Sequence, residues 1–240
     1  MNDHDLVDTS EMYLKAILEL EEEGVTPLRA RLVERFAHSG PTVSQTVDRL
    51  RRDHLLDLGS DRQLRLTEHG RAKATDVMRK HRLIEVFLQQ VVGLDWPLLH
   101  SEACRWEHVV SDHTEDLIDR LLDHPQHSPY GNPVAAGQTA PVENLAGYAA
   151  REEPAAMTIA WIGEPLQAQP DALQELLEQG LTPGATVSVV HRQTHALTLS
   201  KGGAATIELA ENVAKHVFVT AVSPDLPRTA QVGKTAAVVA

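Results

Sequence analysis

The sequence of 240 residues has one cysteine, few aromatic residues (4%) and no long apolar run. A single cysteine, Cys104, excludes an internal disulfide framework and fits a reducing compartment. No apolar stretch approaches the roughly 20 residues that cross a bilayer. The acidic start, MNDHDLVDTSEM, lacks the basic and apolar regions of a signal peptide. We therefore expect a cytoplasmic globular protein with no membrane segment.

Positive charge is also scarce, because the net charge is −12, which by itself argues against a nucleic-acid partner. Its distribution is uneven, however. Residues 26–82 contain 13 Lys and Arg against 7 Asp and Glu, whereas the rest of the chain contains 9 against 27. A basic segment within an acidic chain is typical of a nucleic-acid-binding domain, since phosphate neutralisation supplies most of the non-specific affinity.

The basic segment has the element order of a winged helix-turn-helix. Residues 9–23 and 27–36 have helical patterns, and a third helix begins at Pro41 in PTVSQTVDRLRRDH. The two short alternating runs LLDLG and LRLTEHG, joined by SDRQ, predict a β-hairpin. Because the hairpin follows the helix pair directly, the segment is predicted to bind DNA. The alternatives are a solvated surface helix and a protein-interaction module.

In this fold the start of the second helix of the pair lies in the major groove. Gln45 can pair bidentately with adenine, Ser39 can hydrogen-bond a base, and Pro41 offers apolar contact to a thymine methyl. Thr42 and Ser44, on the polar faces of the same helix, are also expected to contact DNA. Phosphate contacts are expected from five arginines, which are Arg29, Arg31, Arg49, Arg52 and Arg62.

The segment SEACRWEHVVSD indicates a metal site. On a helix running from Pro97 to about Val110, the side chains of Cys104, Glu107 and His108 share one face. A thiolate, a carboxylate and an imidazole together suit a divalent transition metal. The alternative is that Cys104 is a small buried hydrophobe, which is the commoner role of a free cysteine.

Further ligand types lie nearby in the sequence. His100 stands one turn before Cys104, and His81 and Glu85 in RKHRLIEVF form a pair at i, i+4. Two antiparallel helices with these pairs could hold one metal or two, although such a pair also occurs by chance on solvated helices. The His-Glu-x-x-His motif and a nucleophile elbow are absent, so no enzyme is expected.

The composition changes after the helices. Residues 124–147 are rich in proline and glycine and lack apolar periodicity, which predicts a linker. The segments ATVSVVH, ALTLS, ATIELA and HVFVTAV then alternate, and they predict a small antiparallel barrel. We expect this barrel to be a tethered module that can be removed. The residues after Pro227 are expected to be frayed.

Three stretches carry a close resemblance to a known family: DLVDTSEMYLKAILELEEEGVTPLRARLVERFAHSGPTVSQTVDRL, VMRKHRLIEVFL and HSEACRWEHVVSD. They resemble the family of the diphtheria toxin repressor and the actinobacterial iron-dependent regulators, nearly continuously over residues 5–133. The resemblance implies an Fe²⁺-activated repressor that controls iron uptake and homeostasis genes. It also implies a homodimer that binds a palindromic operator, with two dimers per operator.

The implied architecture is mainly α with a β C-terminal domain. Its parts are a winged helix-turn-helix domain at 1–73, a helical dimerisation and metal-binding domain at 74–140, a linker at 141–150, an SH3-like domain at 151–226 and a flexible tail at 227–240.

The resemblance also implies roles for individual residues. The primary metal would be held by Met12, Cys104, Glu107 and His108. An ancillary metal would be held by His81, Glu85 and His100. An anion near the ancillary site would be bound by Arg82, Ser128 and Asn132, and the base contacts would come from Ser39, Pro41 and Gln45.

Two departures from the family are predicted. In the family, the third domain supplies a glutamate and a glutamine to the ancillary site. The matching segment of this chain, LQAQPDALQELL, has Gln169 and Ala172 instead, with Asp171 adjacent. His54 stands where the family has glycine, so a positive φ there would be less well tolerated.

The sulfur ligands Met12 and Cys104 favour iron over manganese, while Co²⁺, Ni²⁺, Zn²⁺ and Mn²⁺ are expected substitutes in vitro. The alternatives are a manganese-responsive repressor of the same family and a thiol redox sensor, although a resolving cysteine is missing from the sequence.

Overall fold

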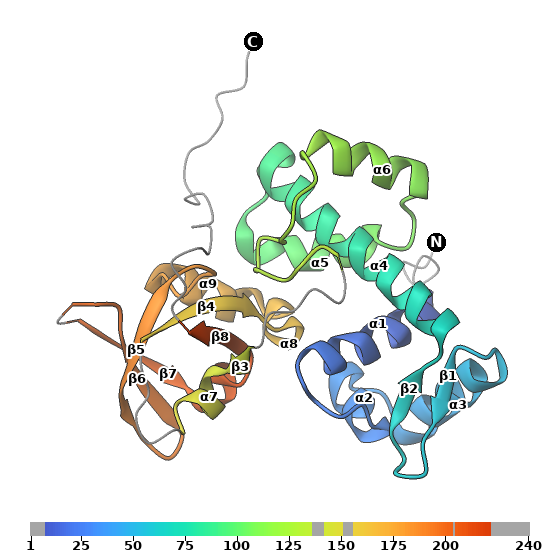
Figure 1. Cartoon of the computed structure of the whole chain (residues 1–240), viewed down its shortest axis with the longest axis horizontal. Helices are drawn as coiled ribbons and strands as arrows, with labels where there is room; N and C mark the ends of the chain where they lie inside the picture. Colours follow the sequence, from blue (N-terminus) through green and yellow to red (C-terminus); the bar gives the residue numbers. More distant parts are fainter. Residues whose placement is uncertain (1–7, 136–141, 151–155, 204, 222–240) are drawn as a thin grey trace. The chain divides into compact units, whose positions relative to one another are not determined.

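The computed structural model describes residues 8–135, 142–150, 156–203 and 205–221. These residues form two compact units. The first comprises residues 8–84, 102–126 and 134–135, and the second comprises 85–101, 127–133 and the described residues from 142 onward. The first unit is helical with one small hairpin, and the second is built on a sheet (Figure 1). Within the described residues, no helix combines the length and the apolar character needed to cross a membrane.

The first unit begins with the predicted helix-turn-helix and wing. Asp8 caps the first helix by accepting hydrogen bonds from the backbone N–H groups of Ser10 and Glu11. The elements are α1 (Thr9–Glu22), α2 (Arg29–Phe36), α3 (Gly40–Arg52), β1 (Leu56–Leu58) and β2 (Leu64–Leu66), and the two strands pair antiparallel. Their apolar faces form one core, which includes the fully buried residues Tyr13, Leu14, Ile17, Leu32, Val43, Val47 and Leu50.

The helices of the predicted metal-binding segment follow. They are α4 (Glu68–Phe87), the π-helical turn η1 (Leu88–Val92), the 3₁₀ turn η2 (Trp96–Leu98), α5 (Leu99–Trp106) and α6 (Asp112–Leu121). The predicted helix from Pro97 to about Val110 is therefore too long. Residues 107–109 form a turn, although the Glu107 N–H still donates to the Ala103 carbonyl at 3.0 Å. This helical hydrogen bond keeps Glu107 one turn beyond Ala103.

The second unit contains a six-stranded antiparallel sheet in the order β3-β8-β4-β5-β6-β7. Its strands are β3 (Glu143–Asn144), β4 (Met157–Ile162), β5 (Thr186–Arg192), β6 (Ala196–Ser200), β7 (Thr206–Ala210) and β8 (Val217–Ala221). Among the described residues from 142 onward, the helices that accompany the sheet are α7 (Leu145–Tyr148), α8 (Glu164–Gln167), α9 (Pro170–Gln179) and α10 (Glu211–Ala214). The predicted small C-terminal β domain of SH3-like type is confirmed. Sequence reasoning missed β4, because five of its six residues are buried and no alternation marks it.

The linker prediction is wrong for the described residues. Within 141–150, residues 143–148 form β3 and α7. Within the wider stretch 124–147, residues 127–133 fold into a loop closed by a bridge between His127 and Pro133. Tyr130 is fully buried in it, donates to the Trp96 carbonyl at 2.7 Å, and accepts the backbone N–H of Ile162 at 2.9 Å. The proline and glycine residues leave no apolar periodicity in this stretch of the sequence, but the buried Tyr130 side chain holds the loop in place. The predicted tail, 227–240, lies outside the described residues.

Candidate metal centre and DNA-reading surface

A buried carboxylate, Glu107, is the centre of the candidate metal site. Its side chain is 3% exposed. One oxygen, Oε2, accepts from the Lys15 ammonium at 2.8 Å and lies 2.5 Å from His81 Nδ1. The other, Oε1, lies 3.2 Å from His108 Nε2. Side chains from α1, α4 and the end of α5 therefore meet at one carboxylate.

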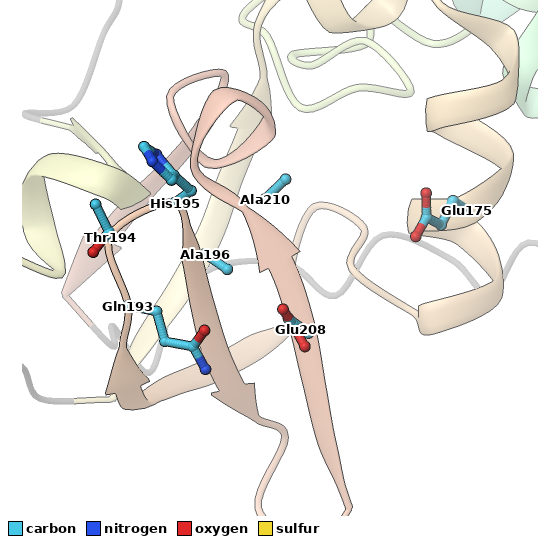
Figure 2. A pocket seen from close by; sticks show the side chains of 7 residues that line it. All are labelled: Glu175, Gln193, Thr194, His195, Ala196, Glu208 and Ala210. Carbon is cyan, nitrogen blue, oxygen red and sulfur yellow. The ribbon is translucent and has the colours of Figure 1, made fainter.

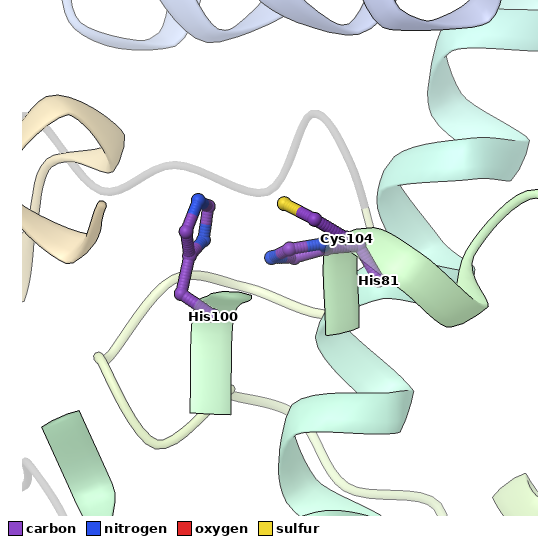
Figure 3. A group of neighbouring side chains, drawn as sticks. All are labelled: His81, His100 and Cys104. Carbon is purple, nitrogen blue, oxygen red and sulfur yellow. The ribbon is translucent and has the colours of Figure 1, made fainter. Parts of the chain in front are cut away.

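The thiol of Cys104 belongs to the same group. Its Sγ lies 3.9 Å from Lys15 Nζ, and the ligand atoms of Cys104 and His81 are within 4.8 Å of each other. Figure 3 shows His81, from α4, and Cys104, from α5, extending side by side, and it also labels His100 of α5. Thiol, carboxylate and imidazoles lie together here, as the sequence predicted for Cys104, Glu107 and His108. The sequence assigned His81 to a second site, and it did not single out Lys15.

Met12 lies on α1 between two residues that touch this group. Its side chain is half-buried and packs against the core of the first unit. Its neighbour Glu11 lies 2.8 Å from His108 Nδ1, and Lys15, one turn later, contacts Glu107. The structure thus places the helix of Met12 against the Cys104–His108 segment.

The neighbouring Lys15 and His81 side chains keep the Glu107 carboxyl ionised. Burial would raise the pKa of this carboxyl, but the Lys15 ammonium and the His81 imidazole outweigh burial and hold the pKa at about 2. An ionised carboxylate beside a thiol and two imidazoles is a donor set that fits a divalent transition metal.

A second group forms around His100. Its Nδ1 lies 3.6 Å from Glu85 Oε1 and 3.2 Å from Glu164 Oε2, and both carboxylates are buried. One turn after Glu164 on α8, Gln167 donates to Asn132 Oδ1 at 2.9 Å. The Gln167 Oε1 atom is buried and has no hydrogen-bond partner among the described residues.

The structure does not place Gln169 or Asp171, the residues that the matching segment offered for this region, beside His100. Gln169 is exposed and donates to the Pro165 carbonyl, and Asp171 is exposed. Glu164 and Gln167 have the glutamate and glutamine side chains that the resemblance implied, three positions apart on one helix. The sequence signal for this pair is a glutamate and a glutamine three positions apart in EPLQ, which overlaps the start of the segment LQAQPDALQELL.

The predicted anion ligands are all buried. Arg82 is bound by a carboxylate of its own chain, because its guanidinium donates to both oxygens of Glu22, at 2.5 and 3.3 Å. Ser128 and Asn132 belong to the loop 127–133, where the Ser128 N–H donates to the Asn132 carbonyl at 2.8 Å.

The predicted DNA-reading side chains line the start of α3. Ser39 caps this helix by accepting from the Thr42 N–H at 3.3 Å, and Pro41, Thr42 and Gln45 are exposed, whereas Ser44 is half-buried. Four of the predicted phosphate contacts are exposed, namely Arg31, Arg49, Arg52 and Arg62.

Two of the arginines are paired within the chain. Arg29, half-buried, forms an ion pair with Asp48 at 2.8 Å, and Arg31 pairs with Glu34 at 3.1 Å. They would have to exchange these partners for phosphates.

Two other features carry no comparable chemistry. The carboxylates of the acidic group Asp76, Asp112 and Glu115 are paired with cations: the Lys80 ammonium lies 2.9 Å from Asp76 and 2.7 Å from Asp112, and Arg79 binds Glu115. In the β domain, an open hollow is lined by Glu175 of α9, by His195 and Glu208, and by four neutral residues (Figure 2).

Comparisons with known proteins agree with this arrangement. Three family models match consecutive parts of the chain: the iron dependent repressor N-terminal DNA binding domain at 5–64, the iron dependent repressor metal binding and dimerisation domain at 67–135, and the FeoA domain at 136–221. The chain is 46% identical over 223 residues to the diphtheria toxin repressor of Corynebacterium diphtheriae, covering 90% of this chain and 98% of that protein. The chain belongs to the iron-dependent repressor family.

Other members agree with this assignment. The iron-dependent repressor IdeR of Mycobacterium leprae is 47% identical over 196 residues, covering 78% of this chain and 85% of that protein. A solved manganese-dependent transcriptional repressor in complex with manganese has a TM-score of 0.76 and 28% identity, covering 89% of this chain and all of that one. The repressor ScaR with bound Zn²⁺ has a TM-score of 0.75 and 27% identity, covering 90% and 100%. The predicted family and fold class are confirmed.

Proposed function

We propose that the protein is an iron(II)-activated transcriptional repressor of iron uptake and homeostasis genes. The observation that carries the proposal is the buried group at Glu107, in a chain that belongs to the iron-dependent repressor family. That group joins α1 of the DNA-binding part to α4 and α5. A ligand held there would favour the arrangement in which these helices are close, and it can do so only through its higher affinity for that arrangement.

The primary metal would be held by Met12, Cys104, Glu107 and His108. When bound, the ion supplies the positive charge that keeps carboxylate, thiolate, thioether and imidazole together. Glu107 is already ionised, and Glu11 beside His108 Nδ1 would orient that imidazole. The ancillary metal would be held by His81, Glu85 and His100, with Glu164 and Gln167 as the contribution of the β domain.

DNA would be read by the exposed start of α3. In our proposal Ser39, Pro41 and Gln45 contact bases while the arginines bind phosphates. A homodimer would present two copies of α3 to the two halves of a palindromic operator, with two dimers on each operator. This arrangement follows the dimerisation domain that the family model names.

Fluorescence anisotropy with a labelled iron-box-like palindromic duplex tests the proposal under anaerobic conditions. We expect tight binding with Fe²⁺, loss of binding on chelation, and loss of metal activation in Glu107→Gln. A scrambled duplex is the control. Equal binding with and without Fe²⁺, or equal binding to both duplexes, would overturn the proposed function.

A manganese-responsive repressor is the second candidate, because manganese-dependent repressors share the fold. The thioether and thiolate of Met12 and Cys104 favour iron, since manganese prefers oxygen ligands. Titration of the same protein with Fe²⁺ and Mn²⁺ distinguishes the two. A lower Kd for Mn²⁺ than for Fe²⁺ in the DNA-binding assay would favour manganese.

A further inference from the structure

A buried ammonium lies among the candidate metal ligands. Lys15 is 5% exposed, and its Nζ is 2.8 Å from Glu107 Oε2, 3.0 Å from His81 Nδ1 and 3.9 Å from Cys104 Sγ. A lysine ammonium has three N–H donors and no lone pair, so it is not a ligand when charged. It instead binds the ligand atoms, as a cation would.

A metal ion and the Lys15 ammonium cannot both bind these atoms without an electrostatic free-energy cost. A divalent ion held by Glu107 would lie within a few ångströms of Lys15 Nζ, and like charges repel strongly at that distance in a site that excludes water. We propose that Lys15 competes with the activating metal ion for Glu107 and so sets the metal concentration at which the protein responds. This rests on the metal centre proposed above.

A second carboxylate can receive the displaced ammonium. Glu19, one turn after Lys15 on α1, has its Oε1 3.9 Å from Nζ and is 6% exposed. A move of Nζ toward Glu19 keeps the buried ammonium paired, which avoids the large cost of an unpaired buried charge.

Glu19 also links α1 to the helix-turn-helix pair. Its Oε2 accepts from Arg35 of α2 at 2.8 Å, and Arg35 is also paired with Glu23 at 3.2 Å. An ammonium that moves from Glu107 to Glu19 therefore joins a carboxylate that already holds α2. Lys15 thereby couples metal binding at Glu107 to α2, the first helix of the helix-turn-helix pair.

The test is a Co²⁺ titration of the full-length protein, read by calorimetry and by the thiolate-to-cobalt absorption, which requires Cys104. Lys15→Met removes the charge and keeps the chain length, and Lys15→Leu removes the charge without adding a thioether that could itself bind Co²⁺. We expect the Kd of both variants for Co²⁺ to fall roughly tenfold, in the usual range of couplings between two ligands. Lys15→Arg, which keeps the charge, should stay near wild type. Lys80→Met is the matched control, because this buried lysine pairs with Asp76 and Asp112 instead, and its Kd should not change.

Loss of the Glu19 carboxylate should change the Co²⁺ affinity in the opposite direction. Glu19→Gln should weaken Co²⁺ binding, and it should have no effect in the Lys15→Met background. Circular dichroism checks folding, and Lys15→Gln replaces Lys15→Met if the latter is unfolded. Wild-type or weaker Co²⁺ binding by the folded variant would overturn the role of Lys15. If Cys104→Ser and Glu107→Gln instead keep the wild-type affinity and absorption, the metal centre itself is wrong, and the competition with it.

Discussion

His54 has a backbone conformation that is unusual for a residue with a side chain, with φ at 56°. It follows the C-cap of α3, where its N–H donates to the Arg51 carbonyl at 3.1 Å and the Leu55 N–H donates to the Leu50 carbonyl at 2.9 Å. These two bonds form a Schellman motif, which favours glycine at the position of His54. His54 therefore adopts the positive φ that histidine was expected to tolerate less well than glycine, and the hydrogen bonds at the helix end compensate for it.

His54→Gly should stabilise the protein by about 0.5–1 kcal/mol. Relief of the left-handed conformation gains about 1–2 kcal/mol, and the greater freedom of glycine in the unfolded chain removes about half of that gain. Urea unfolding measures the change. Asp53→Gly is the control, because the φ of Asp53 is −83° and glycine should bring no gain there. A less stable His54→Gly would contradict the strain argument.

Gln45 lies exposed on α3 and can be tested by itself. Gln45→Ala should relax specificity at one base position and cost roughly 1–3 kcal/mol there, because one bidentate contact is lost. Binding to a set of singly substituted operators measures this. Arg52→Ala should instead weaken binding to all operators alike and reduce the salt dependence. Uniform weakening by Gln45→Ala would place this side chain on the phosphate backbone.

At the scale of elements, α1 connects the candidate metal-ligating segment to α3, the candidate DNA-reading helix. Glu11 and Lys15 contact His108 and Glu107, while between them Tyr13 faces the other way into the core. The Tyr13 hydroxyl lies 3.0 Å from His38 Nδ1, directly before the N-cap of α3. A shift of α1 must therefore be transmitted to the start of α3, since close-packed interiors transmit strain.

Met12→Ala should weaken metal-stimulated DNA binding and leave metal binding by His81, Glu85 and His100 intact. The thioether is the proposed ligand from α1, so its loss uncouples this helix from the metal. Cys104→Ala should be at least as damaging, because a thiolate is the stronger ligand. Co²⁺ calorimetry and DNA titration of both variants measure the effects. Wild-type DNA affinity and metal dependence in Met12→Ala would show that the coupling does not pass through Met12.

At the scale of the whole molecule, the β domain is not the freely tethered module that the proline- and glycine-rich stretch 124–147 predicted. Residues 85–101 and 127–133 belong to the same compact unit as the sheet. Within that unit the Ile162 N–H donates to the Tyr130 carbonyl at 2.9 Å, and Glu164 lies 3.2 Å from His100. Removal of the domain therefore removes contacts to the metal-binding segment.

Truncation after Ala140 should leave metal-dependent DNA binding measurable at saturating Co²⁺ but weaken metal binding around His100. The truncated protein keeps Cys104, Glu107 and His108, whereas it loses Glu164 and Gln167. Calorimetry separates the two classes of site. Full-length Glu164→Gln should reproduce the loss at His100 alone. A truncated protein that fails to dimerise or to bind DNA would show that the β domain is required for the fold of the rest.

The helix-turn-helix, the hairpin and the closeness of Cys104, Glu107 and His108 were predictable, because each follows from local periodicity or from spacing near one helix. The sequence patterns did not predict where α5 ends or that the residues around Tyr130 form a folded loop. Helix ends depend on the last few hydrogen bonds, and a loop anchored by one buried side chain has no periodic pattern.

By itself, the sequence determined the family, the order of the domains and most of the residue types of the candidate site. Only the tertiary structure decided that Lys15 and His81 meet at Glu107, and that Glu164 lies beside His100. These pairs join residues 92, 26 and 64 positions apart. No local propensity encodes such a separation, because the contacts arise only when the apolar faces of distant helices and strands pack together.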